Sequence, residues 1–138
     1  MKKITFLKTF IQTRWLHNFK TRAALEAYQK KQLSNYMDFL KRESPYFKNG
    51  VPTGFDHMDK TFMMAHFNEL NTQGIDRDEA LALAIESEKT RDFTELKGEV
   101  AVGLSSGTSG HRGLFITTEK ERSMWAAAIL AKMLPKRH

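Results

Sequence analysis

The chain has 138 residues, of which 41% are hydrophobic and 28% are charged, and its formal net charge is +6 at pH 7. This length suits one modest domain, and the absence of cysteine excludes disulfides, thiolate metal sites and a cysteine nucleophile. No apolar run approaches the length of a bilayer span, and Lys8 and Arg14 interrupt the apolar N-terminal run, so we expect a cytoplasmic protein without a signal peptide.

Basic residues are concentrated near both ends of the chain. They are Lys2, Lys3, Lys8, Arg14, Lys20, Arg22, Lys132, Lys136 and Arg137. A basic surface attracts nucleic acid or anionic lipid, but no nucleic-acid recognition motif accompanies these charges. We therefore expect a solvated helical face, and no nucleic-acid partner.

An amphipathic helix is predicted over residues 1–20. Its apolar residues recur at helical spacing, with lysine and glutamine opposite: Ile4, Leu7, Phe10, Ile11, Trp15 and Phe19. A helix of this composition also fits a membrane surface. The favoured interpretation is a contact with the core or with a partner, because apolar stripes more often serve that purpose.

A second helix is predicted to begin after Thr21 and to end at Ser44, since the residue before Pro45 resists the α conformation. Its inward stripe is expected to be Leu25, Tyr28, Leu33, Tyr36, Met37 and Leu40. The turn-rich stretch 49–54 that follows is expected to be a surface connection.

Two more helices are predicted before the first strand. Asp59 is placed to cap a helix over residues 60–70, which residues 71–74 close. Asp76 and Glu79 resemble a capping box for a helix that runs to about Lys89. This helix is expected to bury Leu81, Ala84 and Ile85.

A strand, a loop and a second strand are predicted over residues 99–117, and a helix over residues 118–134 that Thr118 and Glu121 open as a capping box. The fold class is α/β: mainly helices, then a β hairpin, then a final helix. Two strands form a marginal sheet, so we expect further strands, self-association or a complementing chain to cover the edges.

The loop between the two strands is the most informative segment. In Val102–Gly113 three glycines recur at a spacing of three, with four hydroxyl side chains close by. Glycine lets the backbone approach a ligand closely, and successive N–H groups then converge on an anion. The segment lacks the Gly-Lys-Ser/Thr of a Walker A loop and the Gly-x-Gly-x-x-Gly of dinucleotide sites.

This loop resembles the phosphate-binding loop of adenylate-forming enzymes, most closely the branch of phenylacetate-CoA ligase and coenzyme F390 synthetase. Further segments resemble that family in the same order: Leu33–Phe47, Met58–Thr61, Phe67–Asn71 and Gly74–Ile75. The similarity covers roughly residues 25 to 134.

The resemblance implies ATP as cofactor, with Mg²⁺ in the complete enzyme and coenzyme A as a candidate acceptor. A carboxylic acid substrate would attack the α phosphorus, giving an acyl adenylate and pyrophosphate. The loop would contact the β and γ phosphates through Ser105, Ser106, Gly107, Thr108, Ser109 and Gly110. Arg112 stands where relatives carry other residues; it replaces a lysine's charge there or points to solvent.

The chain contains no counterpart of the family's adenine-binding segment, ribose-binding aspartate, hinge or C-terminal catalytic lysine. We therefore assign no catalytic residue and interpret residues 1–138 as a partial N-terminal segment of an adenylate-forming domain that is inactive alone. The alternative is a non-catalytic basic interaction module that retains the loop by ancestry or uses it to bind a partner's anion.

Histidines give weaker signals. The spacing of His57 and His66, near Asp56 and Asp59, fits no standard metal-ligand pattern, so no metal site is expected. His111 lies in the loop, where it donates to a phosphate or is an exposed turn residue.

Overall fold

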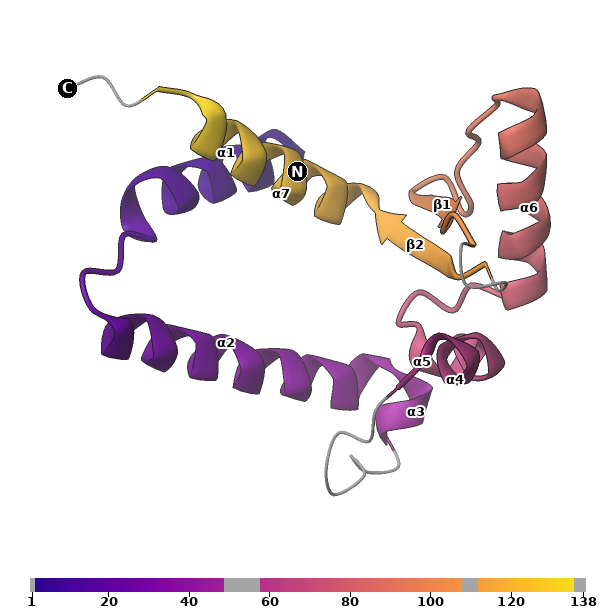
Figure 1. Cartoon of the computed structure of the whole chain (residues 1–138), viewed down its shortest axis with the longest axis horizontal. Helices are drawn as coiled ribbons and strands as arrows, with labels where there is room; N and C mark the ends of the chain where they lie inside the picture. Colours follow the sequence, from indigo (N-terminus) through magenta and orange to yellow (C-terminus); the bar gives the residue numbers. More distant parts are fainter. Residues whose placement is uncertain (1, 49–57, 108–111, 136–138) are drawn as a thin grey trace. The chain divides into compact units, whose positions relative to one another are not determined.

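The computed structural model describes residues 2–48, 58–107 and 112–135 (Figure 1). The chain forms two units: unit 1 comprises residues 1–27 and 117–138, and unit 2 comprises residues 28–116. Most described residues are helical, and one antiparallel two-stranded hairpin precedes the last helix. The expected order of helices, hairpin and final helix is therefore confirmed.

Unit 1 is built from α1 (Lys2–Ile11), the π-helix η1 (Gln12–Leu16), the beginning of α2 (Arg22–Glu43) and α7 (Glu119–Met133). Both α1 and η1 pack against α7 (Figure 1). Ala127 and Ala131 are buried, and their small side chains allow the helices to approach closely. The first helical segment thus ends at Leu16, short of the expected residue 20.

Both ends of α7 are hydrogen-bonded. At its start Thr118 Oγ1 accepts from the backbone N–H of Glu121 at 3.2 Å, and Glu121 Oε2 accepts from the backbone N–H of Thr118 at 2.8 Å, so the predicted capping box is confirmed. At its end the guanidinium of Arg14 donates to three carbonyl oxygens. These are Ala131 O at 3.0 Å, Leu134 O at 2.9 Å and Pro135 O at 2.7 Å. Arg14 therefore satisfies carbonyls that a helix C-terminus leaves without partners.

The helix α2 begins and ends where the sequence predicts, because a 3.2 Å bond from Ala24 N to Thr21 Oγ1 opens it and α3 (Pro45–Lys48) follows after Ser44. Its predicted inward stripe is largely wrong. Only Leu40 is buried, Tyr28 and Met37 are half-buried, and Leu25, Leu33 and Tyr36 are exposed. The burial is confined to the C-terminal end of the helix, where Ser44 Oγ donates to Glu69 O at 2.9 Å.

The single helix expected over residues 60–70 is divided in two, α4 (Lys60–Ala65) and α5 (Phe67–Leu70). His66 separates them with φ −106° and ψ 22°, and its ring lies 4.4 Å from that of Phe62. The predicted cap is confirmed, since Asp59 Oδ1 accepts from Phe62 N at 2.7 Å.

Asn71 holds the turn after α5. Its Nδ2 donates to Phe67 O at 2.8 Å and to Ile75 O at 3.1 Å. Its Oδ1 accepts from the backbone N–H groups of Gln73 at 3.2 Å and Ile75 at 3.1 Å. One side chain thus satisfies backbone groups on both sides of the turn.

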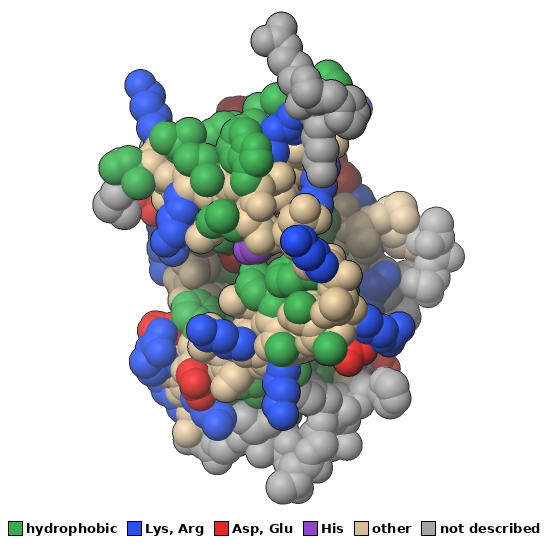
Figure 2. All heavy atoms as spheres, turned by 90° about the vertical axis from the view of Figure 1, so that its left-hand side faces the viewer, with side chains coloured by type: hydrophobic (Ala, Val, Ile, Leu, Met, Phe, Trp, Pro, Cys, Tyr) green, Lys and Arg blue, Asp and Glu red, His purple; other side chains and the backbone are tan. Residues whose placement is uncertain are grey.

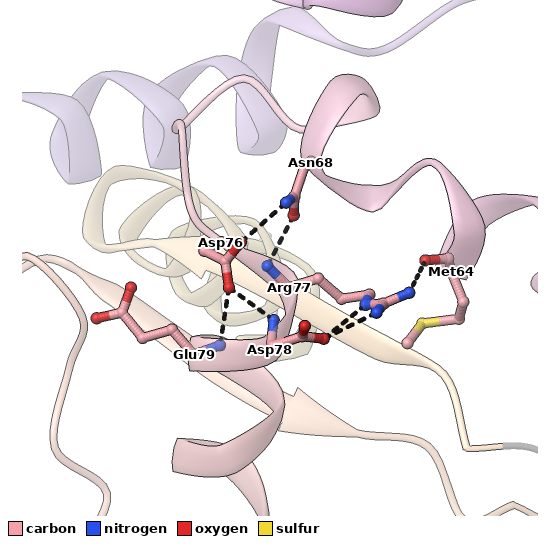
Figure 3. A network of polar contacts seen from close by, with 6 residues as sticks. All are labelled: Met64, Asn68, Asp76, Arg77, Asp78 and Glu79. Atoms are coloured by element: carbon pink, nitrogen blue, oxygen red, sulfur yellow. Dashed lines mark hydrogen bonds and ion pairs between the residues drawn. The ribbon is translucent and has the colours of Figure 1, made fainter.

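The network around Asp76 begins α6 (Arg77–Thr90) (Figure 3). Asp76 Oδ1 accepts from the backbone N–H groups of Asp78 at 2.9 Å and Glu79 at 3.1 Å, and Asp76 Oδ2 accepts from Asn68 Nδ2 at 2.9 Å. The bond from Glu79 N is the main cause that lowers the pKa of Asp76, and the bond from Asn68 is the next. The predicted helix start is confirmed.

The core of unit 2 lies between α5, α6 and the hairpin of β1 (Val100–Leu104) and β2 (Leu114–Thr118). Its buried members are Phe67, Ile75, Ala80, Ala84, Val100 and Leu114. The expectation for α6 is correct for Ala84 and wrong for Ile85, which is exposed, while Leu81 is half-buried. Ala80 is the residue that faces the core instead, because the helix turns a narrow strip of small side chains toward the strands.

Replacing Asn71 with alanine should lower the free energy of unfolding by about 2 kcal/mol, because backbone groups in the turn lose their partners. Chemical denaturation followed by circular dichroism measures the change. The exposed neighbour provides the control: Gln73→Ala should stay within about 0.5 kcal/mol of the unmodified chain. Equal effects of the two substitutions would mean that the Asn71 bonds do not hold the turn.

Candidate functional site

Two hydrogen bonds close the loop between β1 and β2. The backbone N–H of Ser105 donates to Gly113 O at 2.8 Å, and the backbone N–H of Gly113 donates to Ser105 Oγ at 2.8 Å. The hydroxyl of Ser105 therefore accepts from the opposite side of the stem and still has its own proton to donate. The two bonds therefore join the two ends of the loop, at Ser105 and Gly113.

Gly107 is the first glycine of the loop, and its φ of +72° lies in the left-handed region. A Cβ atom built at this position would lie 2.8 Å from Cγ of Arg112. Two independent reasons, the backbone conformation and the close approach of an arginine side chain, therefore require glycine here.

Arg112 crosses the base of the loop to α6. Its Nε donates to Ser105 O at 3.2 Å, its Nη1 donates to Glu88 Oε2 at 2.7 Å, and its Nη2 pairs with Glu88 Oε1. This bidentate arrangement matches the planar guanidinium to the carboxylate. Glu88 thus fixes the direction of the one cation that the sequence places at the end of the loop.

The ion pair shifts both pKa values. The hydrogen bond from Arg112 is the largest cause that lowers the pKa of Glu88, and the bond to Glu88 raises the pKa of Arg112. The side chains of Arg112 and Glu88 are 42% and 45% exposed, so solvent screens the attraction. The ion pair therefore matters more for the orientation of the Arg112 side chain than for the stability of the fold.

Two neighbours pack against the stem. The side chain of Lys60 at the start of α4 lies beside Gly113, where a Cβ atom would be 3.4 Å from Lys60 Cδ. The ring of Phe115 covers Gly103, where a Cβ atom would be only 2.4 Å away. In addition, Met64 Sδ accepts from the backbone N–H of Leu114 at 3.3 Å.

Of the residues that the sequence assigns to phosphate binding, the structure describes Ser105, Ser106, Gly107 and Arg112. It brings Ser105, Gly107 and Arg112 together at the stem, and Ser106 is exposed. Thr108, Ser109, Gly110 and also His111 lie outside the described residues.

Sequence reasoning missed Glu88 and Lys60. Glu88 is one of several acidic residues on α6 and is 24 residues from Arg112, so no spacing in the sequence connects the two. Lys60 is separated from the loop by several intervening elements. Only the tertiary fold brings these residues to the stem.

The described residues contain no group of three or more His, Asp or Glu side chains that could hold a metal ion. His66 Nδ1 contacts Glu69 Oε2 at 3.1 Å, and Asp59 serves as the cap of α4. His57 and Asp56 lie outside the described residues.

A polar cavity of about 230 Å³ lies between α5 and the start of α6. Among its lining residues Arg77 pairs with Asp78 (Figure 3), and the ring of His66 contacts the carboxylate of Glu69. Arg77 Nη1 also donates to Met64 O at 3.3 Å. These contacts connect helix termini, and we assign the cavity a structural role.

The loop and its supports define a candidate anion site at one end of an antiparallel hairpin. No protein-family model, curated protein or solved structure matches the chain. Within the ranges that the structure describes, no helix combines the length and apolar character needed to cross a membrane.

The Glu88→Gln variant should be less stable than the unmodified chain at neutral pH, and the difference should disappear in acid. The folded pKa of Glu88 lies below its ordinary value, so its contribution is present above the unfolded pKa and is lost as the pH falls below about 4. Thermal melts at several pH values measure the difference, with Glu86→Gln on the same helix as the matched control. A difference that persists unchanged at pH 3 would show that ionisation of Glu88 is not its source.

Proposed function

We propose that this chain is the N-terminal part of an adenylate-forming ligase and that loop residues 105–112 hold the β and γ phosphates of ATP. The sequence of the loop suggests the family, and one structural observation supports the assignment most directly. The loop is closed by Ser105 and Gly113 and carries a left-handed glycine and an oriented arginine at its base.

Each part of the loop has a role in this proposal. Gly107 allows the backbone N–H groups to turn toward an anion, and Ser105, Ser106, Thr108 and Ser109 add hydroxyl donors. Gly110 supplies a second position without a side chain. The hydrogen bonds between Ser105 and Gly113 join the two ends of the loop, so a phosphate does not have to bring those ends together.

Arg112 is proposed as the charged contact, with Glu88 as its positioning residue. The contacts to Glu88 and Ser105 occupy three of the five N–H donors of a guanidinium. In our proposal the remaining donors meet a phosphate oxygen. Glu88 reduces the net charge at the loop, so hydrogen bonding there supplies more of the binding than net attraction does.

In the complete reaction, the carboxylate of an acid forms a bond to the α phosphorus while the bond to pyrophosphate breaks. The loop's task is to hold the pyrophosphate portion in line with the attack. Mg²⁺ would neutralise phosphate charge, and coenzyme A is a candidate acceptor of the acyl group. We place this activity in the cytoplasm.

The proposal also requires further polypeptide. The described sheet has two strands, and such a hairpin has open edges that other strands can pair with. A continuing sheet or a complementing chain would provide that pairing as well as the adenine and lysine contacts, whereas a second copy would provide the pairing alone.

Tripolyphosphate and ATP should bind the isolated chain weakly at the loop, and AMP should bind roughly tenfold less tightly, a difference of about 1.4 kcal/mol, because it lacks the β and γ phosphates. Titration of ¹⁵N-labelled protein measures this through amide shifts at residues 105–107 and 112–113. Matched additions of sodium chloride control for ionic strength.

Gly107→Val should abolish those shifts, because a side chain occupies the space in front of the backbone and against Arg112. Gly98→Val is the matched control, since Gly98 has a similar φ of +70° and no atom within 4 Å of a built Cβ. Both variants bear backbone strain of about 1–2 kcal/mol, and only the first should lose binding. Shifts confined to basic residues of unit 1 would contradict the proposed site.

The purified chain should release no pyrophosphate above background when mixed with ATP, Mg²⁺ and aryl or fatty acids. Positioning and charge stabilisation of the transition state come from many groups together, and the loop supplies only some of them. A coupled pyrophosphate assay measures the rate. Robust turnover would mean that the assignment of the other roles to further polypeptide is incorrect.

A further inference from the structure

The net positive charge of the chain comes from unit 1. Its segments, 1–27 and 117–138, contain 11 Lys and Arg and 3 Asp and Glu, which gives a formal charge of +8. Unit 2, with the phosphate loop, contains 11 Lys and Arg and 13 Asp and Glu, a formal charge of −2. A net charge of this size favours association of unit 1 with anionic surfaces.

Unit 1 also exposes an apolar face along α1 and η1. A groove of about 400 Å³ is lined by Ile4, Leu7, Ile11 and Leu16 together with Lys8 and Gln12. Ile4 is 74% exposed and Leu16 is 66% exposed. Ile4, Leu7 and Ile11, which the sequence assigned to a contact with the core or a partner, thus lie at the surface of this unit, whereas Phe10 and Phe19 of the same stripe are half-buried.

The apolar face and the positive charge occur together. The first acidic residue of the chain is Glu26, so α1 and η1 carry only basic charges. Lys8 borders the groove itself, and Lys3 precedes Leu7 by one helical turn. Figure 2 shows exposed hydrophobic side chains with Lys and Arg side chains beside them.

The η1 segment makes several side-chain contacts within unit 1. Its Arg14 donates three hydrogen bonds to carbonyls at the end of α7, and the guanidinium carbon lies 5.7 Å from the ring centre of Trp15. Phe10 contacts the same indole edge-on at 5.9 Å. Trp15 is nevertheless 60% exposed, so an amphipathic ring stands at the surface of η1, next in sequence to the groove residue Leu16.

We propose that the α1 and η1 face of unit 1 docks on an anionic lipid surface. Ile4, Leu7, Ile11 and Leu16 enter the boundary between headgroups and acyl chains, while Lys3 and Lys8 contact the lipid phosphates. A duplex nucleic acid would use the charge but leave the apolar groove uncovered. A purely apolar protein surface would cover the groove but leave the lysines without counter-charges. The lipid surface satisfies both features.

Flotation with vesicles tests the proposal on the full chain. The protein should float with vesicles that mix phosphatidylcholine and phosphatidylglycerol and remain behind with pure phosphatidylcholine, and added salt should weaken binding. In a Trp125→Phe background Trp15 is the sole tryptophan, and its emission should shift to shorter wavelength on binding. Failure to float with the anionic vesicles would overturn the proposal.

Two variants separate the contributions. Leu7→Gln should weaken vesicle binding about tenfold through lost apolar burial, and the Lys3→Glu, Lys8→Glu double variant should weaken it at least about tenfold. Leu33→Gln on α2 is the matched control, because Leu33 is likewise exposed, at 55% against 57% for Leu7, and should leave binding unchanged. Circular dichroism confirms that the variants remain folded.

The alternative partners give different results. Binding to a duplex oligonucleotide that depends on the lysines and not on Leu7, with no vesicle binding, would indicate nucleic acid. Loss of a dimer in Leu7→Gln on sedimentation, again without vesicle binding, would indicate a second copy of the chain. Either result would overturn the lipid proposal, and neither depends on whether unit 2 binds ATP.

Discussion

The pairing of Ser105 with Gly113 is the constraint on which the candidate site depends. It ends the hairpin ladder with one backbone bond and one side-chain bond, and it therefore fixes where the intervening residues begin and end. Arg112 can reach Ser105 and Glu88 only because the stem holds it one residue from this closure. The glycine at 107 is necessary for the same reason, since the arginine passes over it.

The stem in turn depends on the core of unit 2. Val100 and Leu114 begin the two strands and pack with Ala80 and Ala84 of α6, so the helix that carries Glu88 is docked against the hairpin that carries Arg112. The Asn71 turn and the Asp76 cap determine where α6 starts. These local polar contacts thus set the position of the Glu88 carboxylate, although no pattern in the sequence relates Glu88 to the loop.

The two units have net charges of opposite sign, and we propose a different kind of ligand for each. In unit 2 the guanidinium of Arg112 is oriented by Ser105 and Glu88, and this is the feature on which the proposed phosphate contact rests. In unit 1 exposed apolar side chains of α1 and η1 lie near the lysines of α1, and the proposed lipid contact rests on this combination.

The sequence by itself determined the local features: the caps at Asp59, Asp76 and Thr118, the end of α2 before Pro45, the two strands, and the glycine-rich loop between them. Each follows from the chemistry of neighbouring residues, so it can be deduced from a short segment. Only the tertiary structure decided which apolar side chains are buried: Ile4 and Leu7 are exposed, while Ala80 is buried. It also decided which acidic residue pairs with Arg112. Those outcomes depend on contacts between residues far apart in the chain. Helical or strand periodicity shows that an element has an apolar face, but it does not identify what packs against that face.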